Sequence, residues 1–181
     1  MKFKFDVALN DNDYLELNVF WMTKSVYGKK TSLVIKLLVF LMGAMVILLG
    51  FLNEGITVGS VFATSLFAIL IFLIICFYDK YMRLIVKWQI TMLKGKGKLG
   101  YTPQSVIEFF DESFIESTPD SKREERYSSV ERISVVGEKA IYIHLNSVGA
   151  YLLPYSCFES KEQYEEFIDF LKTKCNSVDC Y

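Results

Sequence analysis

Histidine is nearly absent from this chain of 181 residues, in which His144 is the only one. A Ser–His–Asp or Cys–His catalytic group would depend on that single side chain. His144 alternates with Ile143 and Leu145, a pattern that favours a satisfied or solvated strand histidine over a catalytic one. A phosphate-cradling loop is also missing, because the GKGKLG stretch at 95–100 lacks the Walker spacing and does not open a helix. The sequence therefore predicts no enzymatic activity and no catalytic residue.

Cysteine is scarce as well, with four residues in the chain. Cys76 lies inside an apolar run, and the other three fall on the reducing side of a membrane in the topology argued below, so no disulfide framework is expected. Cys175 and Cys180 are close enough in sequence to approach each other or a metal ion. With no histidine near them, free thiols are favoured. We predict neither a metal site nor a cofactor.

Charge is almost absent from two long apolar runs, residues 33–52 and 56–78. At about 1.5 Å per residue, helices of these lengths reach roughly 30 and 35 Å, enough to cross the hydrocarbon core of a bilayer. The exception is Lys36, which lies near the start of the first run, where its stem can carry the ammonium to the headgroups. Two buried helices in a soluble protein are the alternative, but so small a chain has too little other material to cover them.

Small residues suggest how the two apolar helices meet. The connection between the runs is so short that only an antiparallel helical hairpin is possible. Ser60, Thr64 and Ala68 recur every four residues, and Gly43 and Gly50 lie two turns apart. Such positions let helix backbones approach each other in lipid. The same residues are equally compatible with packing between copies of the chain, or with no special packing role.

Basic residues indicate the orientation of the hairpin. They flank the outer ends of both runs, whereas the connecting loop carries only Glu54. The positive-inside rule therefore predicts two spans with both termini in the cytoplasm. The flanking residues are Lys24, Lys29, Lys30 and Lys36 at the first run, and Lys80, Arg83 and Lys87 at the second.

The residues after the second run separate into a basic collar and an acidic body. Residues 79–103 hold six basic residues and one acidic residue, whereas residues 104–181 hold eight basic and fifteen acidic. Because the body has more acidic than basic residues and the excess of basic residues lies in the collar, the pattern argues against a nucleic-acid binder. We expect the second membrane helix to continue to about residue 93, with Lys80, Arg83, Lys87 and Lys94 on one face. That face is either a surface for lipid headgroups or a protein partner, or a solvated collar that only sets the topology.

The remaining residues indicate short strands and two more helices. Apolar and polar residues alternate over 2–9, which predicts a half-buried strand, and Asn10 then caps a helix to about residue 25, broken by Tyr27–Gly28. Further strands are predicted at 106–110, 114–118, within 127–136, and at 140–145 and 150–153, with a turn at 146–149. An amphipathic helix follows the capping box of Ser160 and Gln163.

Residues 118–126 are predicted to be an exposed loop. A phosphate-binding role for its basic residues is the alternative, but the interleaved Glu124 and Glu125 favour a solvated segment. The basic residues concerned are Lys122, Arg123 and Arg126.

The predicted fold class is an α+β membrane protein, in which a two-helix transmembrane hairpin is inserted into a cytoplasmic domain of short antiparallel strands closed by a C-terminal amphipathic helix. We assign residues 1–30 to a strand and helix that join the cytoplasmic domain. Residues 31–80 form the hairpin, and residues 81–181 form the juxtamembrane helix and the β-plus-helix domain.

Three stretches carry a resemblance to a known family: FDVALNDNDYLELN at the start, SSVERISVVGEKAIYIHL, and YLLPYSCF before the last helix. With the two-span hairpin, they resemble the YcxB-like family of bacterial membrane proteins. The segment from Pro154 to Phe158 is similar to the family's Pro-basic-x-x-Phe, with Tyr155 in place of the basic residue. The resemblance implies a bacterial cytoplasmic membrane location and a C-terminal domain similar to pleckstrin-homology domains, and it brings no catalytic residues.

Two hypotheses for the function follow. The first is a membrane-anchored, cytoplasmic-facing interaction module that binds lipid headgroups or a protein partner, possible partners including a second copy of the chain. The second, by analogy with other small multi-spanning membrane proteins, is immunity to a bacteriocin or another envelope-active peptide.

Overall fold

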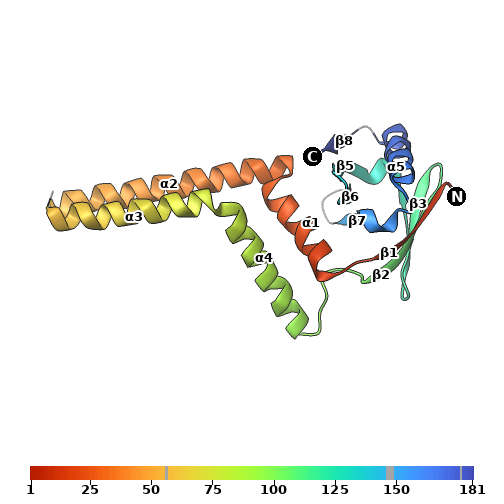
Figure 1. Cartoon of the computed structure of the whole chain (residues 1–181), viewed down its shortest axis with the longest axis horizontal. Helices are drawn as coiled ribbons and strands as arrows, with labels where there is room; N and C mark the ends of the chain where they lie inside the picture. Colours follow the sequence, from red (N-terminus) through yellow and green to blue (C-terminus); the bar gives the residue numbers. More distant parts are fainter. Residues whose placement is uncertain (56, 146–148, 176) are drawn as a thin grey trace. The chain divides into compact units, whose positions relative to one another are not determined.

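The computed structural model describes residues 1–55, 57–145, 149–175 and 177–181 (Figure 1). The chain divides into two compact units, a helical unit of residues 18–98 and a sheet unit of residues 1–17 and 99–181. The predicted α+β class is confirmed, because antiparallel sheets and a C-terminal helix accompany two long apolar helices. The turn predicted at 146–149 lies, apart from Gly149, outside the described residues.

In the helical unit, α2 (Val26–Glu54) and α3 (Val58–Cys76) form an antiparallel hairpin. Both are long and apolar enough to cross a membrane. The tight connection between them is possible because Gly55 adopts a positive φ of 69°, a conformation that glycine adopts at little cost. Thr57 and Ser60 then start α3 with a capping box, which satisfies backbone N–H groups at the helix N-terminus.

The helix α1 (Asp11–Thr23) ends earlier than Tyr27–Gly28, and this corrects the predicted break. The chain turns at Lys24 and Ser25, and the hydroxyl of Ser25 accepts a hydrogen bond of 2.9 Å from the N–H of Gly28 to cap α2. Glycine is needed there for space, since a Cβ on residue 28 would lie 2.2 Å from the carbonyl oxygen of Trp21. The glycine therefore permits a close helix–helix turn and does not stop a helix.

The second apolar helix does not continue through the residues that follow it up to about residue 93, which is a further correction. It ends at Cys76, Phe77 adopts φ −100° and ψ 15°, and α4 (Tyr78–Gly95) begins at the next residue. Figure 1 shows α4 turning away from the axis of α3. These dihedral angles are open to any residue, so no glycine or proline marked the bend in the sequence. At its other end α4 stops with a Schellman motif, in which Gly97 has a φ of 69° and Lys98 N–H bonds Leu93 C=O at 3.0 Å.

One sheet of the sheet unit has the antiparallel order β1-β2-β3-β4. Its strands are β1 (Phe3–Ala8), β2 (Gln104–Phe109), β3 (Ser113–Ser117) and β4 (Lys122–Arg126). The strands predicted at 106–110 and 114–118 are confirmed as β2 and β3, which pair as an antiparallel hairpin with Phe109 opposite Phe114. The prediction of an exposed loop through 122–126 is wrong, because these residues pair with β3. Charged side chains suit β4 because it is an edge strand, where charge discourages pairing with another chain.

The second sheet has the order β7-β6-β5-β8. Its strands are β5 (Val130–Val136), β6 (Ala140–Leu145), β7 (Ala150–Pro154) and β8 (Val178–Cys180), with the short 3-10 helices η1 (Tyr127–Ser129) and η2 (Tyr155–Cys157) beside them. Three strands were predicted. The fourth, β8, pairs parallel with β5, and three residues are too few to show a strand period in the sequence.

The core of this unit lies between the two sheets and under α5 (Lys161–Lys174). Phe167 from α5 is fully buried and contacts rings of both sides of the core, with centroid distances of 4.8 Å to Phe5 and to Phe109 and 5.7 Å to Phe158. These edge-on and tilted pairs are the favoured aromatic geometries. The apolar face predicted for the last helix thus closes the sandwich.

Replacing Phe167 with alanine removes the ring on which these contacts converge. We expect the free energy of unfolding to fall by about 3–5 kcal/mol. Phe167 has no exposed surface, and the space left by its ring cannot be filled by the movement of a single neighbouring side chain. Urea unfolding of the full chain in detergent micelles, followed by near-ultraviolet circular dichroism, measures the change. Glu165→Ala, exposed on the same helix, is the control. Equal losses in the two variants would contradict this account of the core.

Candidate functional site

The helix α4 presents a basic face to the outside. Lys80, Arg83, Lys87 and Lys94 are all exposed. At about 100° per residue they fall within an arc of about 60° on the helix surface. The ammonium of Lys80 lies 5.1 Å from the centroid of the Phe77 ring, at the bend that separates α4 from α3. The structure therefore brings the four predicted basic residues together on one side of a separate helix.

Beside the basic face, α4 carries an exposed apolar stripe within an arc of about 100°. Its two most exposed members are Leu84, at the edge next to the basic face, and Trp88, near its centre, which are 65% and 63% exposed. The remaining members are Tyr81, Ile85 and Met92. Tyr78 and Val86 occupy the third side of the helix and are buried. The helix thus has an exposed apolar surface next to an exposed cationic surface, and its remaining side is buried.

The glycines predicted to pack the hairpin lie in different environments. Gly43 is buried, and a Cβ there would come within 2.1 Å of the end of the Ile71 side chain on α3. A Cβ on Gly50 would meet no atom within 4 Å. Only the first glycine therefore lies at a close approach of α2 to α3.

The small residues of α3 are engaged mainly within their own helix. Ser60 is buried, and its hydroxyl donates a hydrogen bond of 2.9 Å to Gly55 C=O. The hydroxyl of Thr64 donates to Ser60 C=O at 2.8 Å, and Ala68 is exposed. Ser60 thus belongs to the structure that starts α3, one turn from the loop.

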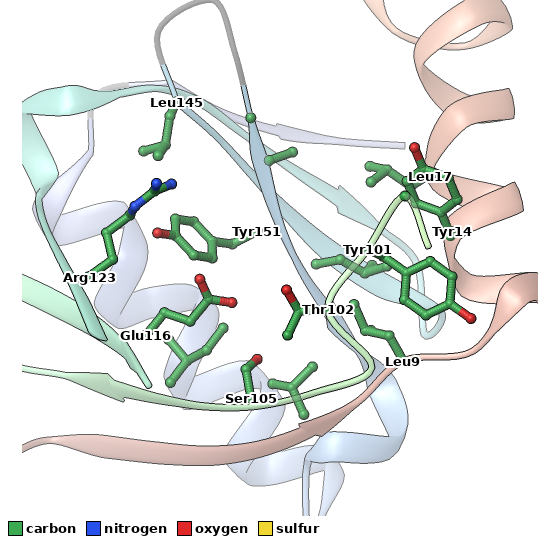
Figure 2. Close-up of a pocket in the computed structure, with 16 residues that line it drawn as sticks. Leu9, Tyr14, Leu17, Tyr101, Thr102, Ser105, Glu116, Arg123, Leu145 and Tyr151 are labelled. Atoms are coloured by element: carbon green, nitrogen blue, oxygen red, sulfur yellow. The ribbon is translucent and has the colours of Figure 1, made fainter. Parts of the chain in front are cut away.

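A cavity of about 230 Å³ opens in the sheet unit (Figure 2). It is lined by residues of β1, β2, β3, β4, β6 and β7, together with the start of α1 and the segment that precedes β2. One end is polar and the other is aromatic and aliphatic. Because the lining comes from many separate segments, no single stretch of sequence carries a signal for it.

At the polar end Glu116, Arg123 and Tyr151 lie next to one another (Figure 2). Glu116 and Arg123 are opposite each other in the register of β3 and β4. Burial raises the pKa of Glu116, against the hydrogen bond of Ser105 and the charge of Arg123, which both lower it. Burial also raises the pKa of Tyr151 to about 12. The Tyr151 hydroxyl is buried without a hydrogen-bond partner of acceptable geometry among the described residues, although Arg123 lies near enough to lower the pKa of that phenol.

The aromatic end is built by Tyr14 and Tyr101, whose ring centroids are 5.3 Å apart. Tyr101 is held by a hydrogen bond of 2.6 Å from its hydroxyl to the carboxylate of Asp11, and this bond is the main reason why its pKa rises to about 12. Gly100 has no room for a side chain, since a Cβ would come within 2.6 Å of the Tyr14 hydroxyl. Leu9 and Leu17 complete this wall.

The phosphate site weighed for Lys122, Arg123 and Arg126 is not assembled as a cluster. Of the three, only Arg123 lines the cavity, and the acidic Glu116 faces it there. Side chains alternate between the faces of a strand, so Lys122 lies on the opposite face of β4 from Arg123. These residues were predicted to lie in a loop, and for that reason they were not assigned to opposite faces.

Comparison with known families matches part of the chain. Residues 109–171 match the family model described as YcxB-like protein. This confirms the resemblance over that segment, which we call the YcxB-like segment. It runs from the last residue of β2 into α5 and holds Glu116, Arg123 and Tyr151. None of the curated proteins or solved structures compared with the chain matches it.

The Pro154–Phe158 motif of the YcxB-like segment has a structural explanation. Pro154 ends β7, and the next three residues form η2, in which Phe158 N–H bonds Tyr155 C=O at 3.1 Å. Phe158 is buried in the core, 4.7 Å from the Phe5 ring centroid. The motif thus turns the chain from the second sheet to α5 and anchors the turn with one ring.

His144, also in the YcxB-like segment, is a buried strand residue as predicted. Its Nε2 lies 3.1 Å from the hydroxyl of Ser134 on the neighbouring strand. Burial, with a smaller contribution from the charge of Arg132, lowers the pKa of His144 to about 4. Among the described residues, the four cysteines are free, and no group of three or more His, Cys, Asp or Glu could hold a metal ion.

The buried imidazole should make the sheet unit sensitive to acid. The unfolded chain takes up a proton at His144 near its ordinary pKa of 6.5, whereas the folded chain does so only near 4. Stability is therefore complete above pH 6.5 and falls as the pH drops toward 4, by about 3 kcal/mol at most.

Substitution His144→Gln removes this titration and keeps a polar side chain. We expect the difference in unfolding free energy between the two proteins to shift in favour of the variant between about pH 8 and about pH 4.5. Urea unfolding at the two pH values measures it, and carboxylate titrations cancel because both proteins share them. A difference that does not change with pH would refute the assignment.

Proposed function

We propose that the protein is a membrane-anchored, non-enzymatic module in which α4 lies along the cytoplasmic surface of a bacterial cytoplasmic membrane and binds anionic lipid headgroups. The observation that carries this proposal is the pairing, on one helix, of an exposed apolar stripe with an exposed basic face. Such a helix lies in a membrane interface with the apolar side toward the acyl chains and the cations toward anionic headgroups.

The position of α4 in the chain also supports contact of this helix with lipid. It begins one residue after α3, a helix long and apolar enough to cross a membrane. A helix that starts at the membrane boundary and bends there can lie in the interface without a further anchor. Trp88 in the stripe is typical of interfacial aromatic residues. Each basic residue near an anionic surface contributes about 1 kcal/mol, so four on one face favour such lipid substantially.

The basic residues also support the proposal that the chain termini lie on the cytoplasmic side of the membrane. Under the positive-inside rule, the cationic residues at the outer ends of α2 and α3 support a cytoplasmic position for both termini. The apolar helices are then two spans, and the sheet unit is cytoplasmic. The ammonium of Lys36 lies 5.1 Å from the centroid of the Tyr78 ring, a pairing suited to the cytoplasmic boundary of the bilayer.

We further propose that the sheet unit has a pleckstrin-homology-like fold. The strands β1 to β4 form one sheet, β5 to β7 are neighbours in the other, and α5 closes the core between them. In that arrangement the two membrane helices are an insertion between β1 and β2. The unit would then serve as the interaction module held at the membrane by its insertion.

The lipid proposal is tested by contact quenching of Trp88 in the full chain. Trp21 is replaced by Phe, so that Trp88 is the remaining tryptophan of the two. The protein is reconstituted into vesicles that contain either dibrominated phosphatidylglycerol or dibrominated phosphatidylcholine at equal mole fraction. We expect both lipids to quench Trp88, and the anionic one to quench it severalfold more strongly. Changing Lys80, Arg83, Lys87 and Lys94 to Gln should remove the difference but keep the quenching.

A matched control variant loses four positive charges from the sheet unit instead of from α4. In it, Lys122, Arg126, Lys139 and Lys172 are changed to Gln. These side chains are exposed in the sheet unit, and the control should keep the preference for anionic lipid. Quenching by neither lipid would place α4 outside the interface, as expected if a protein partner covers it, and would overturn the proposal. Equal quenching of the parent protein by both lipids would also overturn it, since the basic face would then not select headgroups.

A further inference from the structure

We propose that the cavity of the sheet unit binds a small amphipathic zwitterion, an α-amino acid with an apolar side chain. The cavity is separate from α4, since all of its lining residues belong to residues 1–17 and 99–181. The inference therefore does not depend on the lipid function proposed above.

The polar end of the cavity offers complementary groups to both charges of such a ligand. The Arg123 guanidinium is suited to a carboxylate, which it can bind through two parallel hydrogen bonds. The Glu116 carboxylate is suited to an ammonium group. Because these two residues are opposite each other on paired strands, they can bracket two charged groups carried by one carbon atom.

Tyr151 supplies an independent sign that a ligand belongs here. Its side chain is largely buried, since the residue is 8% exposed, and its hydroxyl makes no hydrogen bond of acceptable geometry among the described residues, although the Arg123 side chain lies near it. Buried hydroxyl groups without a partner are unfavourable and uncommon in folded proteins. The hydroxyl lies between Glu116 and Arg123 at the polar end, where it can donate a hydrogen bond to a ligand carboxylate (Figure 2).

The other end of the cavity limits the ligand to a small molecule with an apolar portion. Tyr14, Tyr101 and Leu17 form an aromatic and aliphatic wall there (Figure 2). A volume of about 230 Å³ is below the roughly 300–1,000 Å³ typical of sites for drug-sized ligands. An amino acid of the size of leucine satisfies both the charged end and the apolar end.

Calorimetric titration of the full chain in detergent micelles tests the ligand class. L-leucine is compared with isocaproate, which lacks the amino group, and with isoamylamine, which lacks the carboxylate. L-serine tests the need for an apolar side chain. We expect saturable binding of leucine, and weaker binding by about 10- to 100-fold for each compound that lacks a charged group, because a charged partner in the cavity is then left unpaired.

Variants assign the binding to this cavity. Arg123→Gln and Tyr151→Phe should each weaken leucine binding by about tenfold or more. Arg126→Gln, on the same strand, and Tyr142→Phe, a buried tyrosine outside the lining, are the matched controls and should bind as the parent does. Glu116→Gln should lower the ratio of the affinity for leucine to the affinity for isocaproate. Partial unfolding of the variant would not change this ratio, because it lowers both apparent affinities equally.

Three outcomes would overturn the proposal. The first is no saturable binding of leucine at millimolar concentration. The second is equal affinity of the parent protein for leucine and isocaproate, which would mean that Glu116 does not bind an ammonium group. The third is leucine binding that is unchanged in Arg123→Gln and Tyr151→Phe, which would place the ligand elsewhere on the chain.

Discussion

The sheet unit depends on the pairing of β1 with β2 across the whole helical unit. Phe5 lies opposite Ile107, and both are buried in the core. The pairing is closed at both ends, by Leu9 N–H to Pro103 C=O at 2.9 Å and by Lys2 N–H to Phe109 C=O at 2.7 Å. Because loop-closure entropy rises only slowly with length, by about 0.6 kcal/mol per doubling, a long insertion between two paired strands is tolerated. A preorganised helical hairpin reduces the cost further, since its residues are already ordered.

This arrangement separates the two proposed activities. The α4 surface belongs to the insertion, whereas the cavity belongs to the unit that the insertion interrupts. One feature links them in the chain, because the Schellman motif at Gly97 ends α4 only a few residues before Gly100 and Tyr101, which line the cavity.

Sequence patterns predicted helices and strands well where apolar residues repeat at a regular spacing over most of the element. The apolar face of α5 and the alternation of β1 are examples, since Tyr164, Phe167 and Leu171 in the helix, and Phe5 and Val7 in the strand, are buried at the expected spacing. Prediction failed where pairing with another strand, and not the segment's own composition, decides the structure. Charged β4 became a strand through pairing with β3, and β8 through pairing with β5. Arg123 and Tyr151 are far apart in sequence, so the cavity they share had no local pattern.

Local periods and composition were enough to predict the α+β class, the two long apolar helices, and the one-sided basic face of α4. Three features appear only in the folded chain: Phe77 separates α4 from α3, Gly28 permits a close turn of α1 against α2, and Tyr151 lies beside Glu116. These depend on which backbones come close together, and close approach is a property of the folded chain that no single segment encodes.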